Sequence, residues 1–182
     1  MRIATLILLA AIAAPAVRAD TSPYVSEQSR AIKALSATEI DDLRAGRGMG
    51  LAKAAELNGF PGPAHVLDLA DRLGLSIDQR NATQALVDRM KADAQRLGAD
   101  VIAAEQALDR AFAERKIDND ALQTKLSEIA RLQGELRYVH LRTHLAQAAL
   151  MTPQQRRQYD VLRGYAEDGA TLQHGHGTPP KH

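Results

Sequence analysis

The chain has 182 residues, no cysteine, and 23 basic against 22 acidic side chains. The balanced charge argues against nucleic-acid binding, and the absence of cysteine excludes disulfides and thiolate chemistry. With two Phe, four Tyr and no Trp, the apolar fraction is carried by Ala and Leu, which are strong helix formers. We therefore expect an all-α protein built from long, thin helices rather than one with a deep aromatic core.

The first 19 residues have the pattern of a cleavable signal peptide. Arg2 precedes an uncharged apolar run over residues 3–14, and Val17-Arg18-Ala19 offers small residues before a cleavage site after Ala19. The run is shorter than the roughly 20 residues of a membrane-spanning helix, although an uncleaved anchor is the alternative. Cleavage removes two of the 23 basic residues and no acid, leaving 21 against 22. We expect export to the periplasm and no stable membrane insertion of the mature chain.

The remaining chain divides into a polar, flexible segment over residues 20–34, a helical domain over 35–165, and a disordered His/Gly/Pro tail over 166–182. Helices are expected at 37–45, 51–57, 64–73, 77–114, 120–150 and 153–165, with Gly74 stopping the third. Three of these begin with a capping box, in which a hydroxyl and an acid or amide three residues later bind each other's backbone N–H. The three pairs are Ser36 with Glu39, Ser76 with Gln79, and Thr152 with Gln155.

The two long helices carry matching apolar stripes. In the first, the stripe falls at Leu86, Met90, Leu97, Val101, Leu108 and Phe112, and in the second at Leu122, Ile129, Leu132, Leu136, Val139 and Thr143. Spacings of four and seven residues are typical of one helix face. A short loop near Asp118 joins the helices, so we expect a long antiparallel hairpin with short flanking helices.

Two of the capping boxes lie within longer, similar strings. Leu75-Ser76-Ile77-Asp78-Gln79 opens the first long helix, and Met151-Thr152-Pro153-Gln154-Gln155 opens the last helix. Both resemble the Leu-Thr-x-x-Gln motif of the Spy/CpxP family of periplasmic proteins, with Ser for Thr in the first copy and Met for Leu in the second. The resemblance covers residues 66–163 and leaves out the Gly- and Pro-rich region before them.

The resemblance implies a helical hairpin paired into a cradle-shaped homodimer. It also implies one of several functions, because members of that family act as ATP-independent chaperones, inhibit envelope-stress signalling, or bind heavy metals. Fold is carried over by such a resemblance better than function is.

Histidines are the candidate metal ligands. His140 and His144 are four residues apart, so both lie on one side of their helix at a spacing that a transition metal can bridge. His65 becomes a third ligand if the short helices fold back, and His174 and His176 in the tail are candidates for loose binding of Zn, Ni or Cu. The alternatives are interface or surface histidines and, in the tail, incidental ones. No cofactor is required by any motif.

Other candidate sites are weaker. Met49 and Met151 are isolated thioethers that we assign to the core rather than to copper binding. The glycine-rich stretch 46–50 lacks the features of a phosphate loop, and no catalytic triad or carboxylate pair is legible, so we do not expect an enzyme. Leu141 and Leu145 lie opposite the inner stripe, where they either pack on the last helix or a partner subunit or remain exposed to clients.

Two functions follow from these observations. The expected one is an ATP-independent periplasmic chaperone or envelope-stress protein that binds unfolded or misfolded envelope proteins. The alternative is a periplasmic heavy-metal sensor or metal-binding resistance protein that uses His140 and His144. A purely structural dimer is a third possibility.

Overall fold

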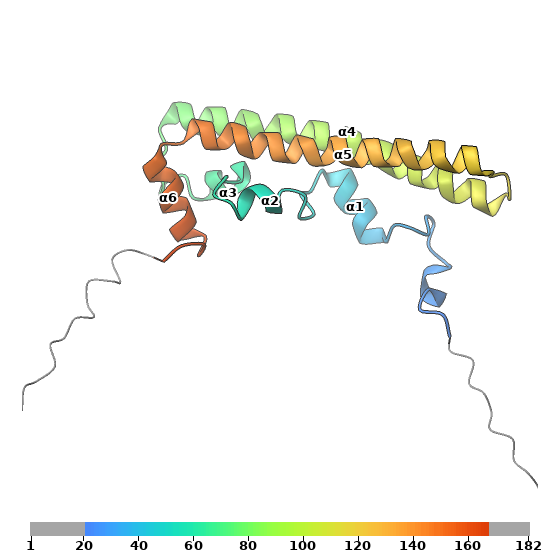
Figure 1. Ribbon diagram of the computed structural model, residues 1–182. Coiled ribbons are helices and arrows are strands. Elements are labelled where there is room, and N and C mark those ends of the chain that lie inside the picture. Colours follow the sequence, from blue (N-terminus) through green and yellow to red (C-terminus); the bar gives the residue numbers. More distant parts are fainter. Residues whose placement is uncertain (1–20, 168–182) are drawn as a thin grey trace, which may run out of the picture.

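The computed structural model describes residues 21–167, and within that range every regular element is helical. Helices α4 (Ile77–Ala113) and α5 (Asn119–Leu150) form the predicted antiparallel hairpin, which confirms the fold class (Figure 1). The short helices flank it in chain order: η1 (Val25–Glu27), α1 (Ala37–Ala45), α2 (Lys53–Glu56), α3 (Pro63–Asp68) and α6 (Pro153–Leu162). The signal segment and nearly all of the tail lie outside the described residues.

Capping residues fix where the helices begin. The hydroxyls of Ser36, Ser76 and Thr152 each accept from the backbone N–H three residues on, at 3.1–3.2 Å, and all three reciprocal side-chain bonds are present. The Asp118 carboxylate caps α5 by accepting from the N–H of Ala121 at 2.8 Å. These bonds satisfy donors that the first turn of a helix leaves free, so the predicted starts are confirmed.

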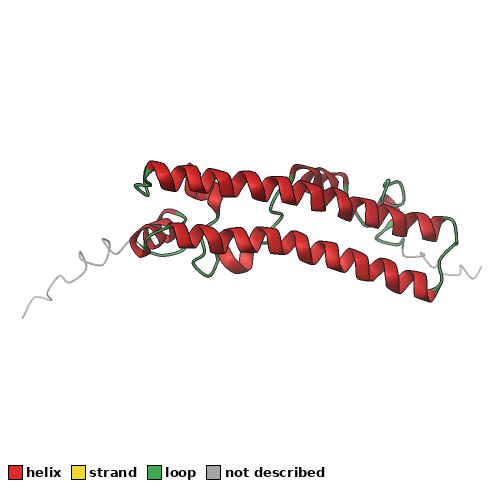
Figure 2. Cartoon of the chain, turned by 90° about the horizontal axis from the view of Figure 1, so that it is seen from above, coloured by secondary structure: helices red, strands yellow, loops and turns green. Residues whose placement is uncertain are grey.

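The hairpin packs along one continuous seam, and Figure 2 shows its two helices running side by side. At about 1.5 Å of rise per residue, the 37 residues of α4 span about 55 Å. The central core consists of Leu43, Ala94, Leu97, Val101, Leu132, Leu136 and Val139. The predicted stripe fails at Phe112, which is 54% exposed because it lies in the last turn of α4, beyond this core.

Helix α1 crosses α4 at a glycine. A Cβ atom at Gly98 would lie 2.3 Å from the carbonyl oxygen of Leu43, so only glycine permits this approach. The contact lets Leu43 enter the central core. A second apolar cluster lies at the end of the hairpin where α3 and α6 meet it, and consists of Val66, Ala70, Leu73, Leu75, Met151 and Tyr159.

The N-terminal half departs from the expected boundaries in two ways. Helices α2 and α3 are shorter than the predicted ranges, and hydrogen-bonded turns carry the chain from Leu69 to Gly74, whose φ is +61°. In the segment 20–34, the structure places the turn η1 and a buried Ile32, and the N–H of Lys33 reaches the Asp109 carboxylate at 3.4 Å. This segment is mostly polar, but its one buried apolar residue, Ile32, packs against the rest of the fold.

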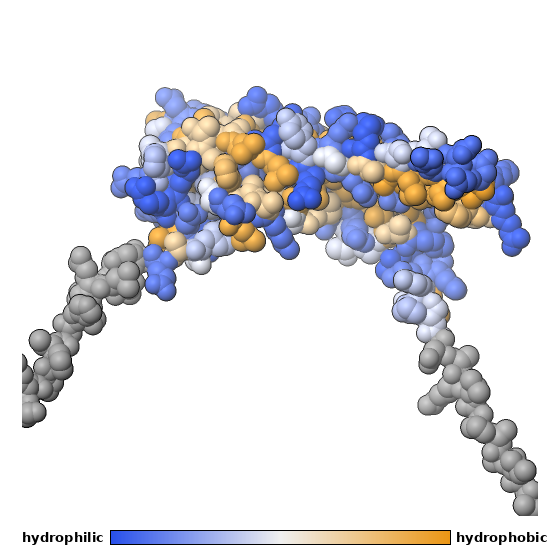
Figure 3. All heavy atoms as spheres, in the orientation of Figure 1, coloured by the Kyte–Doolittle hydropathy of each residue, from blue (hydrophilic) through white to orange (hydrophobic). Residues whose placement is uncertain are grey.

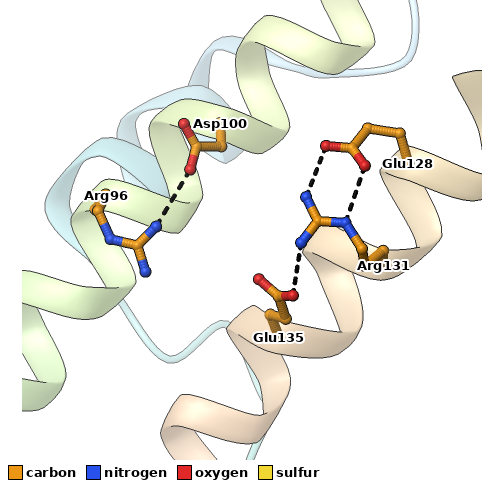
Figure 4. Close-up of polar contacts among 5 residues, drawn as sticks. All are labelled: Arg96, Asp100, Glu128, Arg131 and Glu135. Carbon is orange, nitrogen blue, oxygen red and sulfur yellow. Dashed lines mark hydrogen bonds and ion pairs between the residues drawn. The ribbon is translucent and has the colours of Figure 1, made fainter.

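The outer faces of the hairpin are charged and paired. Arg131 binds Glu128 and Glu135 one turn to either side on α5, while Arg96 pairs with Asp100 on α4 (Figure 4). Solvent screens such exposed pairs, so they contribute little to the stability of the fold. Within residues 21–167, none of the helices is both long and apolar enough to cross a membrane.

Candidate metal-binding cavity

A cavity of about 310 Å³ lies where the short helices meet the hairpin. Helices α4 and α5 form one wall, and residues 48–65 form the other, which the Pro-Gly-Pro turn before α3 brings back toward α5. The lining includes six potential ligands, namely Met49, Glu56, His65, Met90, His140 and His144. The fold thus brings together all three histidines that the sequence analysis proposed within the described residues.

His140 and His144 lie one turn apart on α5, and both are buried. The Nδ1 atom of His144 lies 2.8 Å from the carbonyl oxygen of Phe60. Because a carbonyl only accepts, Nδ1 carries the proton, and the neutral ring then has its lone pair at Nε2. A backbone carbonyl that orients one imidazole nitrogen is the usual support for a histidine that binds metal through the other.

The Nε2 atom of His140 is buried and has no hydrogen-bond partner within the described part of the chain. Burial, reinforced by the nearby His144, lowers the pKa of His140 below its ordinary value. The imidazole therefore stays neutral, which is the form that coordinates metals. An unpartnered buried nitrogen is costly for folding, and a bound ion or water would remove that cost.

His65 lies at the rim of the cavity. Helix α3 folds back against α4 and α5, as a third ligand would require, but the His65 side chain is 48% exposed and its Nδ1 is 3.7 Å from the Asp68 carboxylate. Among residues 21–167, no group of three or more His, Cys, Asp or Glu side chains is arranged to hold a metal ion. Two imidazoles alone therefore need further donors of another type.

Glu56 is a residue of the cavity wall that the sequence analysis missed. Its carboxylate accepts from the hydroxyls of Tyr159 at 2.6 Å and Tyr165 at 3.2 Å, and it lies 3.6 Å from the Arg163 guanidinium. Its other oxygen is 3.7 Å from His144 Nδ1 and has no hydrogen-bond partner among the described residues. Burial, followed by the bond to Glu56, raises the pKa of Tyr159. This network joins α2 to α6 beside the cavity.

The two methionines that the sequence analysis assigned to the core differ in their burial. Met151 is buried in the cluster beside α3 and α6, as expected of a core residue. The assignment of Met49 to the core is wrong, because its side chain is 40% exposed and lines the cavity. The backbone at Met49 has a φ of +43°, and Met49 lies between two glycines. His174 and His176 lie outside the described residues.

The two copies of the family-like motif meet at the same end of the hairpin. Leu75 and Met151 are buried in one cluster, while Ser76 and Thr152 cap α4 and α6. Gln79 and Gln155 each complete their own capping box and also contact each other. Within this chain the motif residues therefore have a structural role.

The outer face of α5 carries exposed apolar side chains. Tyr138 and Leu145 are more than half exposed, and Leu141 is partly buried between them. Arg142 lies over the Tyr138 ring, 5.6 Å from its centre, and pairs with Asp93 of α4. The hydropathy view shows apolar patches among hydrophilic ones on the face that it presents (Figure 3). Within the described chain, Leu145 is thus not covered by α6.

Comparison of the chain with family models, with curated proteins and with solved structures finds no match.

Proposed function

We propose that this protein binds a transition-metal ion in the cavity beside α5, with His140 and His144 as ligands. The observation that carries the proposal is the pair of buried imidazoles one turn apart, with Nε2 unpartnered in His140 and a lone pair left at Nε2 in His144. A metal ion would satisfy both nitrogens at once, whereas an apolar occupant would leave them unsatisfied. In this role the protein is a metal sensor or a metal-binding resistance protein, and no catalytic step is assigned to it.

The setting that we propose is the cell envelope. The signal-peptide pattern of residues 1–19 supports export, and the Leu-Thr-x-x-Gln-like strings support a relationship to the Spy/CpxP family. Homodimer formation is part of the same proposal, because the outer face of α5 leaves apolar side chains free for a partner.

The test is calorimetric titration of the full-length mature chain with Zn²⁺ and Ni²⁺, after the tail histidines have been replaced with alanine. We expect one ion per chain and loss of binding in His144→Asn, because the asparagine amide can still donate to Phe60 while the coordinating Nε2 is gone. His140→Gln should also abolish binding. The control is His65→Ala, which should weaken binding only slightly. Binding unchanged in His144→Asn would refute the proposal, and so would the failure of every transition-metal ion tested to bind.

A second candidate function rests on a separate surface. Tyr138, Leu141 and Leu145 form an apolar strip on the outside of α5, next to charged side chains, and such a strip suits weak binding of unfolded envelope proteins without ATP. The strip predicts that the protein suppresses aggregation of a reduced client and that Leu145→Gln reduces the effect. Leu57→Gln is the matched control, since Leu57 is 65% exposed, against 56% for Leu145, but lies on the short-helix side.

A further inference from the structure

The cavity contains two sulfur donors in addition to its imidazoles. Met90 projects from α4 and Met49 from the glycine-rich loop, so thioethers line the cavity together with His140 and His144 of α5. Thioether sulfur is a soft ligand that favours Cu(I) over hard divalent ions. The chain has no cysteine, so these are the soft donors available beside the histidine pair.

The conformation of Met49 is unusual for a side chain that remains half in solvent. A φ of +43° is unfavourable for a residue with a Cβ, and Met49 does not gain the core burial that normally offsets such strain. Glycine precedes and follows it, yet the strained position itself is not glycine. The backbone here holds a thioether at the mouth of the cavity.

The charges on the cavity wall favour a monovalent ion over a divalent one. Lys53 and Arg163 line it together with a single carboxylate, Glu56, one oxygen of which is already engaged by two tyrosine hydroxyls. A divalent cation with neutral imidazole and thioether ligands would keep its full charge beside those two cations. A monovalent ion has half of that repulsion and needs no carboxylate ligand.

We propose that the cavity is a site for a soft monovalent ion of the Cu(I) class, coordinated by His140, His144 and Met90, with Met49 closing the mouth. This inference rests on the proposed metal-binding function and specifies its ligand. Cu(I) commonly takes three or four donors, so two imidazoles and one or two thioethers complete the coordination that two histidines alone leave open.

The experiment is an anaerobic competition titration of the full-length mature chain, lacking only its tail histidines, with Cu(I) held by a chromophoric chelator. Met90→Leu and Met49→Leu preserve side-chain size and, at position 49, the backbone strain. We expect each to weaken Cu(I) binding by about tenfold or more and to leave Zn²⁺ binding within about twofold of the parent. Circular dichroism checks that each variant folds.

A second measurement needs no substitution. In selenomethionine-labelled protein loaded with Cu(I), X-ray absorption should detect selenium bound to copper. Copper coordinated by nitrogen alone, or unchanged affinity in both leucine variants, would overturn the soft-ion inference while leaving metal binding by the histidines intact. Failure of Cu(I), Zn²⁺ and Ni²⁺ all to bind would refute the proposed function itself.

Discussion

The side-chain amides of Gln79 and Gln155, 76 positions apart in the chain, donate hydrogen bonds to each other, at 2.9 and 3.1 Å. Each amide oxygen also accepts from the backbone N–H of its own N-cap residue, Ser76 or Thr152. The amide of Gln79 additionally donates to the carbonyl of Leu150 at the end of α5, at 2.8 Å. One pair of side chains thus holds the starts of α4 and α6 and the end of α5.

This pairing predicts energetic coupling between the two motif copies. Gln79→Ala and Gln155→Ala should each lower the free energy of unfolding by about 1 kcal/mol, because each loses a cap and an interhelical bond. The double variant should lose less than the sum, with a coupling energy of about 0.5–1 kcal/mol. Chemical denaturation of the four proteins measures this, and strictly additive losses would mean that the amide pair contributes nothing.

The α1–α4 crossing predicts opposite effects of the same substitution at two glycines. Gly98→Ala should destabilise the fold by about 1–3 kcal/mol, because its Cβ would overlap the Leu43 carbonyl. Gly134→Ala on α5 should stabilise by about 0.5–1 kcal/mol, since that position is helical, exposed and open. Thermal unfolding followed by circular dichroism compares them. A neutral Gly98→Ala would show that α1 does not depend on this close contact.

Among the three capping boxes, only that of α1 closes with a carboxylate. The bonds from Ser36 hold the pKa of Glu39 below its ordinary value of 4.5. The stabilisation is therefore fully present above pH 4.5 and is lost as the pH falls through the lowered pKa of the folded state. Glu39→Gln should reduce this acid sensitivity. The measurement is unfolding free energy from pH 6 to 3, and parallel curves for parent and variant would contradict the assignment.

The Glu56 network predicts unequal roles for two tyrosines. Tyr159→Phe should destabilise by about 1–3 kcal/mol, because it removes a buried partner from Glu56 and from the N–H of Gly62. Tyr165→Phe removes a longer bond from a more exposed ring, so its cost should be a few tenths of a kcal/mol, roughly that of an exposed hydrogen bond. Equal losses in urea denaturation would show that burial does not decide the strength of these bonds.

Local chemistry in the sequence predicts much of the fold. The caps at Ser36, Ser76, Asp118 and Thr152 depend on residues within one turn. The starts of these helices can therefore be predicted without tertiary information. The inner stripe of α5 is legible for the same reason, because periodicity alone places Leu132 and Leu136 inside. The all-α hairpin follows from these two kinds of signal.

The cavity was less predictable, because it forms where segments far apart in the sequence pack against each other. The helix spacing pairs His140 with His144, but only the fold places Glu56 and Met49 beside them. Glu56 resembles any solvated helix charge in the sequence, and its burial comes from Tyr159, 103 positions later. Met49 was misassigned because an apolar residue is normally placed in the core, and no local signal reveals a positive φ at a non-glycine residue.

The crossing of α1 at Gly98 has a consequence for the order of folding. The surface that receives α1 belongs to α4, and the core that Leu43 enters is completed by Leu132, Leu136 and Val139 of α5. The hairpin can form through contacts between residues that are near in sequence, around the 114–118 loop. Helix α1 can pack into the core only after both α4 and α5 are in place. Helix α1 therefore has no complete core to pack into until residue 139 has been synthesised, so an element made before the hairpin is among the last to reach its final position.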